Sequence, residues 1–219
     1  MTPAQIVTAA RRKYNSTSSS FYSDAEIYDL IYQAELEIAL ETKILEGRTV
    51  ISGGSVDGTQ GYAFPTGCLE VRRVEYNGQK LKYIDFQQDD ALTLANSNTT
   101  AEGTPQYYYI WDSTIYLRPI PDTSSVQIRV YYYKEPTAVT TAGQTLEVPA
   151  ALHLMMVDRI AAELAAKDQN FDTAQYYMDL WLNSHMPRIK RWARKRKTGD
   201  AFKVVKDEEA LAGTILGAL

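Results

Sequence analysis

A basic run near the end of the chain is the clearest candidate for chemistry. The segment RIKRWARKRK lies on a molecule whose formal net charge is −4. Its cationic residues are Arg188, Lys190, Arg191, Arg194, Lys195, Arg196 and Lys197. At helical spacing Arg188, Arg191 and Lys195 share one face, so they could bind phosphates, or equally an acidic protein surface. A third interpretation is that the run only complements the helix dipole and keeps the terminus solvated.

Catalytic and cofactor motifs are missing from the sequence. The glycine-rich segment Gly53–Gly61 lacks the Gly-Lys-Ser/Thr ending of a phosphate-binding loop, and we interpret it as a loop. His153 and His185 stand on separate predicted helices, with no Cys or carboxylate at ligand spacing, so each is expected to be a partly buried helix residue. We therefore predict no cofactor and no metal.

Carboxylates and the thiol give no better candidates. Asp89–Asp90 and Glu208–Glu209 are adjacent pairs, which point in different directions on a helix, so we expect solvated charge. Cys68 has no neighbouring His to activate it and is expected to be a small buried apolar residue. The sequence predicts no catalytic residues and a protein that is not an enzyme.

Composition restricts the class further. The chain has 219 residues, 45% hydrophobic and 23% charged, which is ordinary for a globular protein. An acidic balance argues against a general nucleic-acid coating protein. One cysteine excludes an intrachain disulfide, and no apolar stretch reaches the length of a membrane span. We expect a protein that is made in a reducing cytoplasm and does not span a membrane.

Two helices are predicted at the start of the chain. Thr2 with Gln5 and Ser23 with Glu26 match the capping box. The second helix, with Ile27, Ile31, Ala34, Ile38 and Leu45 on one face, is expected to run to about Glu46 and to be stopped by Gly47.

Residues 49–134 have the alternation of strands. LEVRRVEY and QKLKYIDF flank Asn77-Gly78, which predicts a hairpin with Glu75 opposite Lys80. In this register Val71 and Val74 face opposite sides of the sheet. Both apolar side chains can be buried only if the strand contains a bulge or is covered on both sides. A second hairpin is predicted around Asp112-Ser113, followed by the strand VQIRVYYY, and one short helix in QDDALTLA. We expect one antiparallel sheet of about five strands, with its tyrosines serving sheet packing or subunit contact.

Helices return after Pro149. A first helix carries Leu152, Met156, Ile160 and Leu164 on one face. A last helix, capped by Asp172, is expected to turn Trp181 and Ile189 inward and to be kinked or broken at Pro187.

The terminal segment 198–219 is expected to form an arm that docks outside its own subunit. It holds too few large side chains to offset the entropy of ordering itself, yet its aliphatic residues would be a liability in water. The docking residues predicted are Phe202, Val204, Val205, Leu211, Ile215, Leu216 and Leu219.

The predicted fold class is α+β: a helical bundle with two N-terminal and two C-terminal helices, an inserted antiparallel β domain and an extended C-terminal arm. The expected units are residues 1–48 and 149–197 for the bundle, 49–148 for the β domain and 198–219 for the arm.

The order of these segments resembles the head-to-tail adaptor proteins of tailed bacteriophages. The resemblance rests on IYLRPIPDTSSVQIRVYYYKEPTAV, TLEVPAALHLMMVDRIAAELA and FDTAQYYMDLWLNSHMPRIKRWARKRK, and on IVTAARRKYN with YSDAEIYDLIYQAELEIALET at the start. It covers about residues 2–200. The large β insertion departs from the smallest helical members of that family.

The resemblance implies a structural virion protein at the head–tail interface. Such adaptors form a ring, usually of twelve copies, below the portal protein, extend the DNA channel and give tail, nozzle or fibre proteins a platform. A C-terminal arm reaches back to the portal, which implies docking of residues 198–219 on the portal or a neighbouring subunit. The resemblance also implies that packaged DNA passes through the channel as a partner of the ring. The alternatives are a nucleic-acid-binding protein that uses Arg188–Lys197, and another neck or tail-tube subunit.

Overall fold

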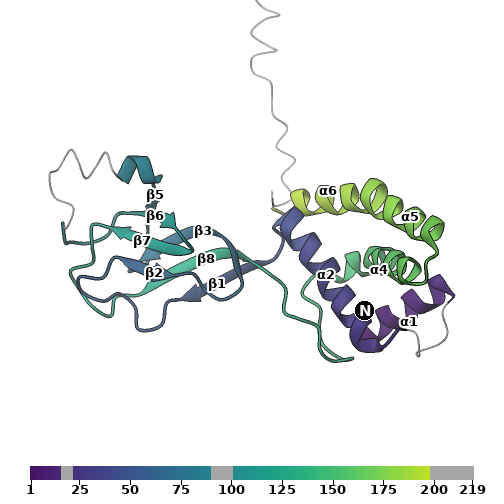
Figure 1. Ribbon diagram of the computed structural model, residues 1–219. Helices are drawn as coiled ribbons and strands as arrows, with labels where there is room; N and C mark the ends of the chain where they lie inside the picture. The colour runs from purple at the N-terminus through teal and green to yellow at the C-terminus, as the bar shows by residue number, and fades with distance from the viewer. Residues whose placement is uncertain (16–21, 90–100, 198–219) are drawn as a thin grey trace, which may run out of the picture.

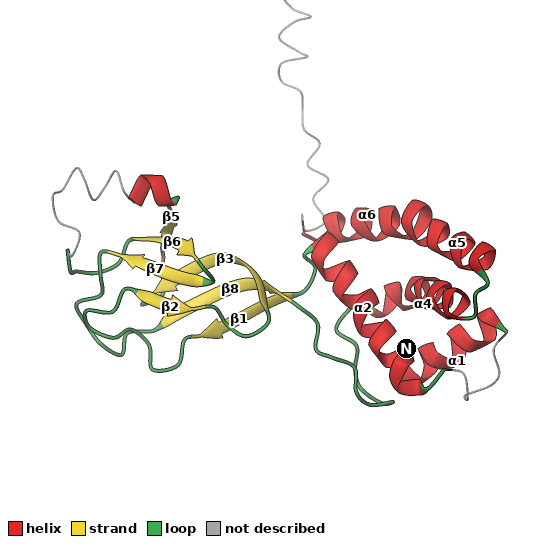
Figure 2. Ribbon diagram, viewed as in Figure 1, coloured by secondary structure: helices red, strands yellow, loops and turns green. Residues whose placement is uncertain are grey.

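The computed structural model of the chain describes residues 1–15, 22–89 and 101–197 (Figure 1). Within these ranges the helices are α1 (Pro3–Tyr14), α2 (Asp24–Thr42), α4 (His153–Lys167), α5 (Phe171–Leu180) and α6 (Met186–Lys197). The strands are β1 (Glu46–Val50), β2 (Gly61–Ala63), β3 (Cys68–Tyr76), β4 (Gln79–Lys80), β5 (Lys82–Tyr83), β6 (Tyr107–Trp111), β7 (Thr114–Arg118) and β8 (Ile128–Lys134). Figure 2 shows α1, α2 and α4–α6 gathered on one side, and the strands on the other together with a short helix whose described residues are 86–89. The predicted α+β class is confirmed.

Both predicted capping boxes are present. Thr2 Oγ1 accepts the Gln5 N–H at 3.4 Å, and Gln5 Oε1 accepts the Thr2 N–H at 2.9 Å. Ser23 and Glu26 exchange the same pair of hydrogen bonds at the start of α2. The side chains therefore satisfy backbone donors that the first turn of each helix leaves without partners.

The second helix ends earlier than predicted. α2 stops at Thr42, and Lys43 takes the left-handed C-cap conformation (φ 51°), with its N–H donating to Ala39 O at 2.7 Å. Gly47 is not the stop signal but lies inside β1. Its lack of a side chain serves packing instead, because a Cβ there would stand 2.7 Å from Cζ of Tyr132 on the neighbouring strand.

The strands form two sheets, so the expectation of one antiparallel sheet is wrong. Sheet A has the order β1-β8-β3-β4, and sheet B has the order β2-β7-β6-β5. The chain leaves sheet A after the two-residue strand β4 and enters sheet B as β5, which pairs parallel with β6. Every other strand pair in the two sheets is antiparallel.

Both predicted hairpin turns are confirmed. Asn77 (φ 49°) and Gly78 (φ 75°) join β3 to β4 with Glu75 opposite Lys80, and Asp112 and Ser113 also have positive φ between β6 and β7. The expected bulge is present as well, since the β3–β8 register shifts between Val71 and Arg73. This shift lets Val71 and Val74 both face the interior.

Two hydrophobic cores are built from the described residues. One lies between the sheets and includes Val74, Ile115, Leu117, Ile128 and Val130. The other joins the helices and includes Ile6, Ile31, Met156, Trp181 and Ile189. The connection that follows β8 belongs to the helical core, because its residues Val139, Leu146 and Val148 are buried there.

That connection is held by a buried carboxylate. Glu35 on α2 is 1% exposed, and its Oε1 accepts the Val148 N–H at 3.0 Å. Burial raises the pKa of Glu35, and the backbone N–H groups of Val148 and Glu147 offset part of this effect. The folded chain therefore holds the Glu35 proton more tightly than the unfolded chain does.

Glu35 should make the free energy of unfolding fall as pH rises. Below the ordinary carboxyl pKa of 4.5, Glu35 is protonated in both the folded and the unfolded chain. Above 4.5 the unfolded chain releases this proton first. The stabilisation that the protonated Glu35 gives to the folded chain is therefore lost as the pH rises through the raised pKa. We expect Glu35→Gln to lose less stability than the wild type between pH 4.5 and 7 in urea titrations. The exposed Glu26, whose pKa is lowered to about 2, gives a control of opposite sign in Glu26→Gln. Parallel pH curves for wild type and Glu35→Gln would contradict this assignment.

The last helices start and join differently from the prediction. After Pro149 a 3₁₀ turn (Ala150–Leu152) precedes α4. Asn170, not Asp172, caps α5, because Asn170 Oδ1 accepts the Thr173 N–H at 3.3 Å while Asp172 lies in the first turn. Pro187 does not break the last helix into separate helices. A π-helical turn (Trp181–His185) precedes the proline, and α5 and α6 follow one another in one curved rod (Figure 1).

Candidate interaction surfaces

α6 has one apolar face and one basic face. Met186, Ile189 and Ala193 are buried against the rest of the helical part. The exposed basic residues are Arg188, Arg191, Arg194, Lys195 and Arg196, while Lys190 is half-buried and Lys197 is the last residue of the helix. The structure therefore places Arg188, Arg191 and Lys195 together on the outer side of α6, as their spacing predicts.

Part of the basic run is engaged within the chain. Lys190 Nζ lies 2.6 Å from Glu41 Oε2 on α2, and the Arg196 guanidinium lies 5.5 Å from the centre of the Trp192 ring. In the part of the chain that the structure describes, no ion pair or hydrogen bond engages Arg188 or Arg191. These two residues keep their charge available for a partner.

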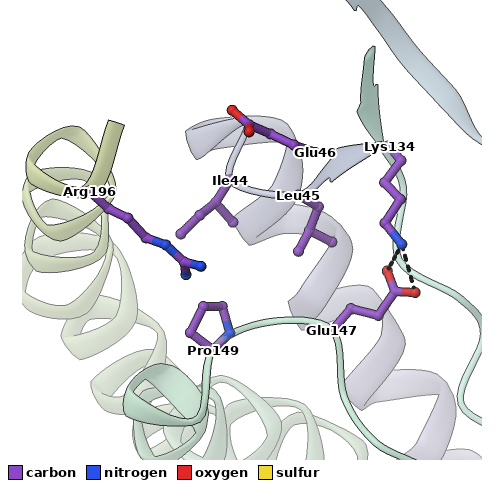
Figure 3. Close-up of a pocket in the computed structure, with 7 residues that line it drawn as sticks. All are labelled: Ile44, Leu45, Glu46, Lys134, Glu147, Pro149 and Arg196. Carbon is purple, nitrogen blue, oxygen red and sulfur yellow. Dashed lines mark hydrogen bonds and ion pairs between the residues drawn. The ribbon is translucent and has the colours of Figure 1, made fainter. Parts of the chain in front are cut away.

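The carboxyl end of α6 meets the start of sheet A at a cleft of about 430 Å³ (Figure 3). Its lining residues are Ile44, Leu45, Glu46, Lys134, Glu147, Pro149 and Arg196. In Figure 3 Arg196 reaches from α6 toward Pro149, and the opposite wall is held by the ion pair of Lys134 and Glu147 at 3.0 Å. Both signs of charge line the cleft, so it does not select anions or cations.

Part-buried polar contacts position the rod of α5 and α6. The Trp181 indole N–H donates to Glu37 Oε1 on α2 at 2.8 Å, and Glu37 also pairs with Arg159 on α4 at 3.2 Å. His185 Nε2 lies 2.7 Å from Oδ2 of the buried Asp158 on α4, which also pairs with Lys13. The last helix is thereby joined to both α2 and α4, and the basic face is fixed relative to them.

The other sequence candidates, His153 and Cys68, lie on α4 and β3 and not on the basic face of α6. His153 Nε2 contacts Val148 O at 2.7 Å, and burial lowers the pKa of this imidazole. Burial raises the pKa of the half-buried Cys68 thiol to about 11, which makes it a poor nucleophile. No group of three possible metal ligands occurs within residues 1–15, 22–89 and 101–197.

Asp89 corrects one expectation. It is buried instead of solvated, and its two carboxylate oxygens accept from Arg118 Nε at 2.7 Å and from Arg118 Nη2 at 2.9 Å. The partner stands 29 positions away on β7, so local sequence spacing contains no sign of the pair. Asp90, Glu208 and Glu209 lie outside the described residues.

Sequence reasoning missed the large apolar side chains that the helices expose. They are Leu40 on α2, Leu154 on α4, Phe171 and Tyr176 on α5, and Leu182 on the π-helical turn. The signal was present at Leu154, Phe171 and Leu182, which fall off the apolar stripe of their helices. The predicted docking residues Phe202, Val204, Val205, Leu211, Ile215, Leu216 and Leu219 lie outside the described residues, so their role stays a prediction.

Comparison with known proteins supplies the context for these surfaces. None of the described helices is both long and apolar enough to cross a membrane. A search of curated proteins finds no match. The family model described as SU10 adaptor protein matches residues 1–201, which is most of the chain, and this family consists of phage head-to-tail adaptors. The chain therefore belongs to the SU10 adaptor protein family and is a bacteriophage virion component.

Proposed function

We propose that this adaptor assembles as a ring of twelve copies below the phage portal, extends the DNA channel and carries the tail, nozzle or fibre proteins. In this proposal the helices α1, α2 and α4–α6, with the connection that packs into their core through Val139, Leu146 and Val148, act as the bundle that forms the ring. The two sheets, from β1 to β8, act as an inserted β domain that faces the tail components. Residues 198–219 act as an arm that docks on the portal or a neighbouring subunit. The family match supports the role of adaptor.

The observation that carries ring formation is the apolar surface of the helices. Leu154 is 70% exposed and Phe171 is 68% exposed, with Leu40, Tyr176 and Leu182 also at least half exposed. Large apolar side chains on several helices of one part favour burial against other copies of the chain. They lie on different helices, which suits the two unlike surfaces that each subunit of a ring needs.

Electron microscopy of the chain mixed with its portal protein tests the proposal. We expect twelvefold rings seated on the portal, with the helical part in the lateral contacts. The variant Leu154→Ser/Phe171→Ser should reduce the ring fraction, and Val56→Ser, at an exposed valine outside the helices, is the matched control. Portal particles without an added ring at saturating chain would refute this function.

A second candidate function is binding of DNA by α6. The exposed Arg188 and Arg191, without partners among the described residues, favour it. DNA binding by the isolated chain would then weaken steeply with salt, since each phosphate contact releases a counterion. Weak binding that Arg188→Gln/Arg191→Gln leaves unchanged would dismiss this alternative.

A further inference from the structure

Strand β1 leaves one edge of sheet A open. In the described part of the chain β1 pairs only with β8, and Figure 2 shows it as the outermost strand. Ile51 N–H donates to Ile128 O at 2.9 Å, and Lys134 N–H donates to Leu45 O at 3.0 Å. Odd-numbered positions therefore turn their backbone groups toward β8, and the N–H and C=O of Glu46, Arg48 and Val50 point the opposite way.

This edge has few of the features that normally block strand addition. Glu46, Arg48 and Val50 are all exposed, β1 contains no proline, and its register with β8 is continuous over five residues. Proteins usually protect a long edge with proline, a bulge, charged side chains or a covering segment. Of these features the described part of β1 has the charges of Glu46 and Arg48. The opposite edge of the same sheet is β4, which has only two residues. β1 is thus the better acceptor for an additional strand.

A positive charge stands at the middle of the open edge. Arg48 pairs across the sheet with Tyr131, and Tyr131 pairs with Arg73, so the three side chains form one row on the outer face. Arg73 lies 5.4 Å from the Tyr131 ring centre and pairs with Glu75. No hydrogen bond or ion pair engages Arg48 among the described residues. An added strand that brings a carboxylate to this row would neutralise Arg48.

The chain itself contains a segment of that chemistry. Residues 202–206 read FKVVK, and residues 207–209 read DEE. Aromatic and β-branched residues are good strand formers, and the three carboxylates complement Arg48. We propose that residues 202–209 of a second copy add to β1 as an antiparallel strand. This proposal rests on the proposed function, in which the arm docks outside its own subunit, and it names the receptor on the neighbouring copy.

Chain length favours a second copy over the same chain. Arg196 and Glu46 line one cleft, so the arm leaves α6 beside the Glu46 end of β1 (Figure 3). Residues 198–201 span at most roughly 14 Å, whereas the five residues of β1 cover roughly 17 Å. If Phe202 is the first paired residue, a chain's own arm therefore enters from the Glu46 end, which would give a parallel pair. All pairs in sheet A are antiparallel, and antiparallel pairing is slightly more stable per residue.

A labelled peptide of residues 198–219, titrated onto the dilute full-length chain, tests the inference. We expect saturable binding. Arg48→Pro removes one outward N–H and the charge, and should raise Kd on the order of tenfold or more. Lys80→Pro is the matched control, because Leu81 N–H donates to Val74 O at 3.0 Å and the Lys80 backbone therefore points away from β3 at the opposite edge. Its Kd should equal that of the wild type.

Further variants keep the test decisive if Arg48→Pro fails to fold. A peptide carrying Val204→Pro should bind the wild-type chain on the order of tenfold more weakly, and Arg48→Gln, which keeps its N–H, should weaken binding mainly at low salt. Equal binding of both peptides, or of wild type and Arg48→Gln at low salt, overturns the proposal. Hydrogen exchange gives a further outcome that overturns the proposal. If the Arg48 and Val50 amides are already fully protected from exchange in the full-length chain at high dilution, the chain's own arm occupies the edge.

The outcomes separate this inference from the proposed function. If the peptide does not bind the chain but removal of the arm still abolishes portal docking, the β1 receptor is wrong and the adaptor function stands. If removal of the arm leaves portal docking at full strength, the arm has no role in assembly, and the proposed function fails in that part whatever the peptide does.

Discussion

A chain that ends at Gly199 is expected to fold like the full-length protein and to lose its binding to the portal. The two hydrophobic cores are built from contacts among residues that precede Thr198, with Ile189 and Ala193 as buried positions on α6. The free energy of unfolding should therefore change little. Portal docking should weaken roughly 100-fold or more, because a ring multiplies the loss of one contact over all its copies.

A pull-down of the chain by immobilised portal measures this effect, with a urea titration to show that the truncated chain is folded. A full-length variant supplies the sharper comparison, because it keeps the length and charge of the arm while Leu211, Ile215, Leu216 and Leu219 become Ser. We expect this variant to behave like the truncation. A variant with Arg188 and Arg191 changed to Gln tests whether the positive charge on α6 also contributes to portal binding. Docking of the truncated chain at wild-type strength would end the arm hypothesis.

The helical elements were predictable where the determinant is local. Capping boxes at Thr2 and Ser23 can be recognised from two residues three positions apart, and the structure contains both. The outward position of Arg188 and Arg191 follows from helical periodicity in the same way. The end of α2 was not predictable by the same rules. Lys43 adopts the left-handed cap that Gly47 was expected to supply, because β1 must begin at Glu46 to pair with β8.

The division into two sheets depends on long-range pairing. The segment after Asn77-Gly78 reads as one continuous strand, yet it contributes only Gln79–Lys80 to sheet A before Lys82–Tyr83 joins sheet B. Leu81 and Ile84 are both buried, so side-chain alternation does not mark the change of sheet. The π-helical turn before Pro187 is similar: proline predicts a disturbance, but whether the helix breaks or widens depends on what Trp181 contacts.

The candidate surfaces divide in the same way. The basic face of α6 could be identified from the sequence, whereas the cleft between Arg196 and Glu46 exists only because α6 ends where β1 begins. The free edge of β1 likewise appears only once the strand order is known. The docking role of residues 198–219 was predicted from their composition, and it stays a prediction because these residues lie outside the described part of the chain.

Trp181→Ala is expected to destabilise the fold far more than any substitution on the exposed face of the helices. Trp181 is 0% exposed, packs in the helical core and donates its indole N–H to Glu37 at 2.8 Å. Truncation of a buried Trp to Ala costs about 3–5 kcal/mol of the free energy of unfolding, because it removes buried area and leaves a cavity. Since small domains have only about 5–15 kcal/mol in total, the variant should unfold at a much lower urea concentration.

Two further variants separate the contributions of the Trp181 hydrogen bond and of burial to the free energy of unfolding. Trp181→Phe keeps an aromatic ring but removes the donor to Glu37; because Glu37 retains Arg159 as a partner, this change should cost about 1–2 kcal/mol beyond the lost ring area. Leu182→Ala, at the adjacent and half-exposed position, should cost less than about 1 kcal/mol. Trp181 anchors the rod that carries the exposed Phe171 and Tyr176, so Trp181→Ala should also weaken ring formation at temperatures where the chain is still folded. If Trp181→Ala and Leu182→Ala unfold at the same urea concentration, the π-helical turn does not anchor the last helix to α2.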